Sequence, residues 1–202
     1  MTARDITREV LLEALGSSAT PFVPVPFVDD WIVARLLRRI AKKVLVRQGI
    51  EASQDMRKHL VDGFVGAGET PLAERAAVGA VRFVVRKVAI VLDVKKSHDV
   101  FGEAIAFALA LDAAIARGAI HSMPARDAGA MLHRAVVSVG SAAVETLAGA
   151  IRGSFERERD AAGRSSSQTR AARITDAVGK QIDEAATRLA SAVDQELASR
   201  RR

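Results

Sequence analysis

The chain has 202 residues, 49% of them hydrophobic, and a formal net charge of +6 at pH 7. A chain of this length and composition can bury a sizeable core, which predicts one domain with an appendage, and its basic balance favours an anionic partner, either phospholipid or nucleic acid. Cysteine is absent, which excludes disulfides, thiolate metal sites, iron–sulfur clusters and a cysteine nucleophile.

The N-terminal stretch MTARDITREVLLEALG predicts a short helix. Asp5 is the expected cap, and the helix should run to about Leu15, where Gly16 ends it. Charged residues interrupt the apolar positions, so the stretch lacks the core of a signal peptide. We therefore expect a cytoplasmic protein, and its location at the inner face of the membrane is compatible with this expectation.

The most unusual stretch runs from Pro21 to Gln48 and reads PFVPVPFVDDWIVARLLRRIAKKVLVRQ. Its prolines predict an extended turn over residues 20–27, after which Asp29 or Asp30 can cap a helix. At about 100° per residue, one side of this helix is apolar and should face the core. That side consists of Val33, Leu36, Leu37, Ile40, Ala41 and Val44, and the opposite side carries Arg35, Arg38, Arg39 and Lys42.

The basic side of this helix has no acidic residue after Asp30, so the usual intrahelical ion pairs cannot form. Trp31 and Val46 fall among the cations, a mixture that is typical of a helix lying at a membrane interface. The sequence predicts a binding site for an anionic surface made of Trp31, Arg35, Arg38, Arg39, Lys42 and Lys43. The alternative is that acidic residues elsewhere in the fold neutralise this charge.

The motif PFVPVPFVDDW, followed by a long helix and then by Ala-rich hydrophobic helices, resembles bacterial EcsC-type helical proteins. In that family a Pro-x-Pro loop leads into an amphipathic helix, and the resemblance covers residues 21–155. It implies a peripheral, membrane-associated character and carries over no catalytic residue.

Gly49 should end the basic helix, and Ser53 with Asp55 should begin a short helix that ends at Gly63. The following run GFVGAGE, over residues 63–69, predicts a loop. It is not a phosphate-binding loop, because the Gly-Lys-Ser/Thr ending is absent.

Three longer helices are expected next. The first begins at Thr70–Pro71 and extends to Lys96, and the second begins at Ser97 and ends at Arg117, before Gly118. The third begins at Met123–Pro124 and extends to about Asp160. The uninterrupted apolar run of the second helix, Ala104 to Leu111, is far shorter than the roughly 20 residues that a membrane span needs.

Residues 161–170, AAGRSSSQTR, have the composition of a linker between a domain of residues 1–160 and a C-terminal amphipathic helix over 171–202. That helix has a modest apolar stripe of Ile174, Val178, Ile182, Ala185, Leu189, Ala192 and Val193. The stripe could pack on the domain, pair with another subunit or partner protein, or lie on an anionic surface. The predicted fold is all-α: a single bundle of five or six core helices with an extra C-terminal helix.

The chain contains no strong catalytic motif. The four histidines His59, His98, His121 and His133 lack metal-pair spacing, so no metal or cofactor site is predicted. Three carboxylates lie on apolar helices and could act as acids or bases, namely Glu103, Asp112 and Glu145. The simpler interpretation pairs them with Arg82, Arg86 or Arg134 across the bundle.

These observations favour a non-enzymatic protein of the membrane periphery, or an interaction protein, that docks through the basic helix. Two alternatives stay open. Non-specific binding of nucleic acid would use the same charge and would depend steeply on salt. An enzyme of unknown reaction would use the carboxylates in a closed pocket.

Overall fold

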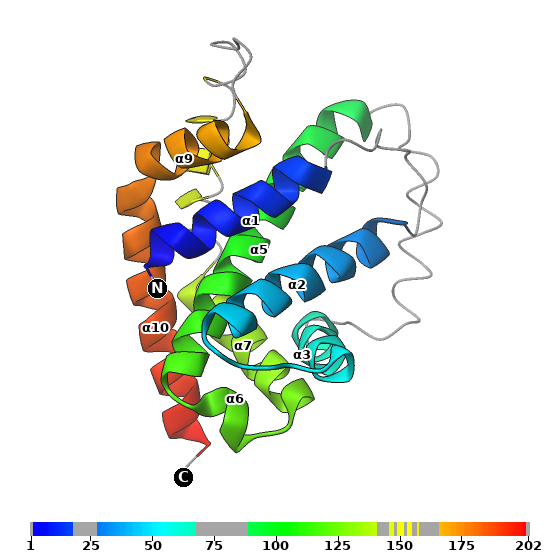
Figure 1. Ribbon diagram of the computed structural model, residues 1–202, viewed down its shortest axis with the longest axis vertical. Coiled ribbons are helices and arrows are strands. Elements are labelled where there is room, and N and C mark those ends of the chain that lie inside the picture. Colours follow the sequence, from blue (N-terminus) through cyan, green and yellow to red (C-terminus); the bar gives the residue numbers. More distant parts are fainter. Residues whose placement is uncertain are drawn as a thin grey trace.

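The computed structural model describes residues 2–17, 28–67, 89–140, 146–147, 149–151, 153–154, 157 and 166–200. These residues contain helices and no strand, which confirms the predicted all-α class. The helices are α1 Ala3–Ser17, α2 Val28–Arg47, α3 Gln54–Gly66, α5 Ala89–Ala116, α6 Ala119–Ser122, α7 Ala125–Val139, α9 Ser167–Ala177 and α10 Gly179–Ser199. They pack as one bundle, with α5 running through its centre (Figure 1).

Helix α1 begins with a reciprocal cap between Thr2 and Asp5. The Thr2 hydroxyl accepts a hydrogen bond from the Asp5 amide at 3.2 Å, and the Asp5 carboxylate accepts one from the Thr2 amide at 3.0 Å. Hydrogen bonds from Thr2 lower the pKa of the Asp5 carboxyl. The expected cap is therefore corrected: Thr2 is the N-cap, and Asp5 lies in the first turn, where its charge favours the helix.

Helix α2 has the predicted orientation. Its expected core side is buried or half-buried, and Leu45 is buried with it. The helix ends as predicted at Gly49, which adopts the left-handed conformation with φ of 74°. The Ile50 amide donates to the Leu45 carbonyl at 2.9 Å and the Gly49 amide donates to the Val46 carbonyl at 3.0 Å, which is the hydrogen-bond pattern of a Schellman motif.

Helix α3 begins at the predicted cap, because the Ser53 hydroxyl accepts a hydrogen bond from the Met56 amide. Its predicted end at Gly63 is wrong, since the helix continues to Gly66. A Cβ atom on Gly63 would lie 2.0 Å from the Arg126 carbonyl oxygen, and one on Gly129 would lie 2.0 Å from the Leu60 carbonyl oxygen. These glycines therefore let α3 and α7 approach until their backbones touch.

Two expected helix boundaries in the middle of the chain are corrected. Helix α5 passes through Ser97 without a break, so Ser97 caps no helix. The helix expected from Met123–Pro124 to Asp160 ends at Gly140, where φ is 85°. The end of α5 before Gly118 is confirmed, because Gly118 has φ of 70° and leads into the short helix α6.

The C-terminal stretch forms two helices that pack on α1, α5 and α7. Helix α9 begins at Ser167, inside the predicted linker, because the Ser166 hydroxyl caps it by accepting the Thr169 amide. The chain bends at Val178 before α10. All seven residues of the predicted apolar stripe are buried in the core that the whole bundle shares.

Three ion pairs join α10 to the rest of the bundle. Arg4 binds Asp183 at 2.6 Å, Arg134 binds Glu196 at 2.8 Å, and Arg117 makes a bidentate contact with Asp194. The first pair lies where the N-terminus of the chain runs beside α10 (Figure 1). Helix α10 is thus held by apolar burial at its inner side and by charge at its edges.

Candidate anion-binding surface on α2

Four residues form an exposed line along α2, which we call the basic ridge: Arg35, Arg39, Lys42 and Val46. They recur at intervals of four, three and four positions, so they share one side of the helix over about 16 Å. Val46 is 57% exposed, one of the two large hydrophobic side chains that are prominent at the surface of the described residues. The ridge therefore combines three cations with an aliphatic group on the outside of the bundle.

Ion pairs with the neighbouring helices flank the ridge on both sides. On the α3 side, Arg38 binds Asp62 at 3.3 Å. On the α1 side, one oxygen of Glu9 accepts the Lys43 ammonium at 3.2 Å and its other oxygen accepts the Arg47 guanidinium. The Glu9 side chain is only 22% exposed, so it lies between α1 and α2 rather than in open solvent.

These contacts correct part of the sequence interpretation. Arg38 and Lys43 were expected to serve an external anion, but acidic residues of the same chain compensate them. The alternative of neutralisation within the fold is thus right for the flanks of the helix. Arg35, Arg39 and Lys42 keep the exposure that the helical pattern predicts.

Trp31 belongs to the predicted site and lies in α2, four positions before Arg35. Its side chain is outside the described residues, as are the prolines of residues 20–27 and the predicted helix start at Thr70–Pro71. The described part of the site is therefore the basic ridge with its two paired flanks.

Sequence reasoning missed Glu9 and Asp62, which form ion pairs with cations on the two flanks of α2. Each carboxylate lies next to an apolar stripe of its own helix, beside Val10 in α1 and Val61 in α3. An acid at the border of a buried stripe lies close to the neighbouring helix, and both of these acids contact cations of α2. The sequence did not identify which helix that neighbour is.

Of the three candidate catalytic carboxylates, the structure describes Glu103 and Asp112. Asp112 accepts a hydrogen bond from the side-chain amide Nε2 of Gln48, and Arg134 pairs with Glu196. The predicted pairing of Arg134 with Glu103 or Asp112 is therefore not found. Glu145, Arg82 and Arg86 lie outside the described residues.

Glu103 lies at the surface of the bundle, but the pKa of its carboxyl is raised above the ordinary value for glutamate. The cause is desolvation by the surrounding protein, and the nearby charge of His133 opposes it. The His133 ring packs edge-on against Phe64, with ring centres 5.5 Å apart, and Phe64 packs in the same way against Phe107. This arrangement gives His133 a packing role at the rim of the core.

Metal ligation finds no support in the part of the chain that the structure describes, where no group of three His, Asp or Glu side chains converges. His59 and His121 are exposed, and the side chain of His98 is not described.

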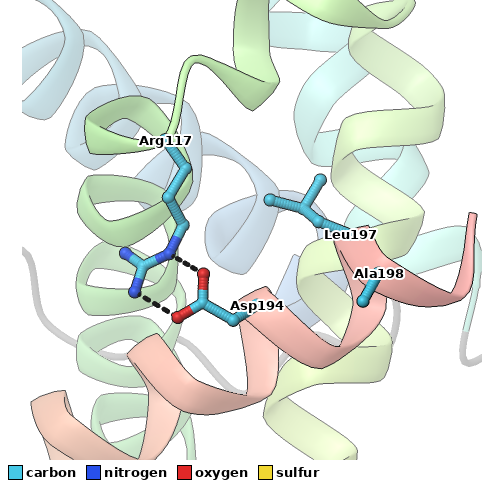
Figure 2. Close-up of a pocket in the computed structure, with 4 residues that line it drawn as sticks. All are labelled: Arg117, Asp194, Leu197 and Ala198. Atoms are coloured by element: carbon cyan, nitrogen blue, oxygen red, sulfur yellow. Dashed lines mark hydrogen bonds and ion pairs between the residues drawn. The ribbon is translucent and has the colours of Figure 1, made fainter. Parts of the chain in front are cut away.

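A surface depression of about 390 Å³ is lined by Arg117, Asp194, Leu197 and Ala198. Figure 2 shows the Arg117 guanidinium and the Asp194 carboxylate pointing toward each other across it, so the charged groups bind each other. Their hydrogen bonds raise the pKa of Arg117 and lower the pKa of Asp194. The contact is structural, and it offers a substrate no unsatisfied group.

None of the helices in the described ranges is both long and apolar enough to cross a bilayer. Comparison of the chain with protein-family models, curated proteins and solved structures found no match. The resemblance to EcsC-type proteins therefore stays a prediction, and the proposal below depends on the surface of α2.

Proposed function

We propose that this chain is a non-enzymatic peripheral membrane protein that docks on anionic lipid headgroups through the basic ridge. The observation that carries the proposal is the exposed line of Arg35, Arg39, Lys42 and Val46 on one outer side of α2. Cations attract an anionic surface, with about 1 kcal/mol for each basic residue held near it. The ridge therefore supplies an electrostatic attraction that three residues share.

The exposed aliphatic group favours lipid over nucleic acid. At a headgroup layer, Val46 and the methylene stems of the arginines and the lysine leave water while their charged ends stay solvated. A phosphate backbone offers no apolar layer to receive Val46. Trp31 lies in the same helix, and tryptophan is enriched at membrane interfaces.

The packing of α2 in the bundle also supports docking through the ridge. The inner side of the helix is buried against the bundle and its C-terminal end is closed by the Schellman motif at Gly49. The ridge is therefore presented on a prefolded helix and loses little conformational entropy when it docks. We expect the bundle to lie on the membrane with α2 roughly parallel to its plane.

Vesicle flotation tests the proposal. The protein should float with phosphatidylcholine vesicles that contain phosphatidylglycerol and stay behind with vesicles of phosphatidylcholine alone. Arg35→Glu with Arg39→Glu should lower recovery with the anionic vesicles about ten-fold or more, since two attractive charges become repulsive. The matched control is Lys180→Glu with Arg188→Glu, two exposed cations of α10 whose reversal changes the net charge equally.

Equal recovery with both kinds of vesicle, or equal loss in the two double variants, would reject docking through the ridge. Binding of a DNA or RNA duplex that falls steeply with salt, without binding to anionic vesicles, would assign the same charge to nucleic acid instead.

A further inference from the structure

We infer that Glu9 limits the affinity of α2 for anionic surfaces by holding Lys43 and Arg47 at the edge of the basic ridge. This inference rests on the proposed function. It adds that Lys43 and Arg47 lie beside the ridge, and that the Glu9 carboxylate of α1 competes with lipid headgroups for binding to them.

The contacts of Glu9 carry the inference. Its two oxygens are divided between two cations one helical turn apart, with Lys43 at 3.2 Å and Arg47 on the other oxygen. Both cations nevertheless keep contact with solvent, because the side chains of Lys43 and Arg47 are 38% and 42% exposed. A headgroup phosphate that approaches α2 from outside can therefore reach either cation, but it must compete with a carboxylate that is already in place.

Helix geometry puts these cations next to the ridge. Lys43 follows Arg39 by four positions and Lys42 by one, and Arg47 follows Val46 by one. Taking about 100° per residue, Lys43 and Arg47 lie on the α1 side of the line that runs from Arg35 to Val46. Neutralising Glu9 would remove its ion pairs with two cations that lie beside the ridge, without moving the backbone of α2.

Glu9 is well suited to this role because it is positioned by packing. Ile6 and Val10 of α1 are buried on either side of it along the helix, and Val44 and Leu45 of α2 are buried beside its two partners. The backbone of Glu9 is therefore held beside α2, and its side chain is only 22% exposed. On the opposite flank, Asp62 pairs with one cation, Arg38, whereas Glu9 on the α1 side pairs with two.

The test replaces Glu9 with Gln, which keeps the shape and a hydrogen-bond acceptor but removes the charge. Glu9→Gln should bind anionic vesicles about five-fold more tightly than the unchanged protein, since two basic residues become more available. The control Glu184→Gln changes net charge by the same amount on α10, and it should leave vesicle affinity nearly unchanged.

A second pair of variants separates local from general effects, and its measurement in the presence of Glu9 does not depend on Glu9→Gln folding normally. Lys43→Gln with Arg47→Gln should cost little affinity while Glu9 is present and should abolish the gain in the Glu9→Gln background. If the unchanged protein binds anionic vesicles and Glu9→Gln behaves like Glu184→Gln, the inference fails and the proposed function stands. A large loss from Lys43→Gln with Arg47→Gln in the presence of Glu9 would also overturn it. If neither the unchanged protein nor Glu9→Gln binds, both are rejected.

Discussion

Helices α2 and α10 are both amphipathic, and both carry several arginines or lysines, yet the bundle uses them differently. The apolar stripe of α10 is buried with Leu189 at 1% exposure, and three of its carboxylates pair with arginines of other segments. Helix α2 also buries one side, but the ridge residues Arg35, Arg39, Lys42 and Val46 are exposed. The bundle buries the apolar stripe of α10 between helices, whereas the basic ridge of α2 stays at the surface.

The burial of the α10 stripe also limits how a partner could bind the C-terminal stretch. Its apolar stripe was a candidate contact for a second subunit or for a membrane. That stripe lies in the core of the bundle. A partner that binds α10 would therefore meet its outer, charged face, where Lys180 and Arg188 are exposed.

The largest expected effect compares one apolar residue from each helix. Leu189→Ala should lower the free energy of unfolding by about 3 kcal/mol, because a buried leucine leaves a cavity. Val46→Ala should change it by less than about 0.5 kcal/mol, because Val46 is mostly in water. Urea denaturation of both variants measures the difference. Similar losses in the two would mean that Val46 is packed, and the ridge would lose its aliphatic member.

A second prediction concerns the helix that supplies Asp62 to the flank of α2. Gly63→Ala should cost about 2 kcal/mol, because its new methyl group would collide with the Arg126 carbonyl and push α3 from α7. Gly66→Ala is the control in the same helix, since a Cβ atom there meets nothing within 4 Å. That control should be neutral or slightly stabilising. Equal stability of the two variants in a thermal melt would contradict the close approach of α3 and α7.

A smaller effect is expected from the charge that fixes α10. Arg117 lowers the pKa of Asp194, so folding is favoured while Asp194 is ionised, at pH values above its unfolded pKa. This contribution is lost as the pH falls through the folded pKa. Asp194 is 58% exposed, which limits the contribution to about 0.5 kcal/mol.

Asp194→Asn should therefore lower Tm slightly at pH 7, and the difference from the unchanged protein should shrink toward pH 3. A difference in Tm that stays constant between these pH values would show that the ion pair adds nothing to the stability of the fold.

Periodicity within a single helix was enough to predict the two sides of α2, since 100° per residue assigns Leu37 and Ile40 inward and Arg35 and Arg39 outward. It could not predict the pairing of Glu9 with Lys43, because that contact joins residues 34 positions apart and depends on how α1 packs. The sequence thus predicted the exposed ridge but not its paired flanks.

Glycines explain two of the boundary errors. Gly63 was interpreted as a helix end, but in α3 it permits close contact with α7. Gly140 was passed over inside a long helical pattern, although it ends α7 with a positive φ. A glycine has the same sequence signature in a stop, a turn and a close approach, and only the neighbouring helix decides which applies.

The central claim is that the outer side of α2 meets the anionic surface, and the single tryptophan of the chain offers the most direct measurement. Trp31 precedes Arg35 by one helical turn, so its fluorescence reports on the environment of α2. Emission should shift to shorter wavelength with vesicles containing phosphatidylglycerol and not with phosphatidylcholine alone. Arg35→Glu with Arg39→Glu should abolish the shift, and Lys180→Glu with Arg188→Glu should preserve it. An unchanged spectrum, or a shift that survives reversal of the ridge, would contradict the claim.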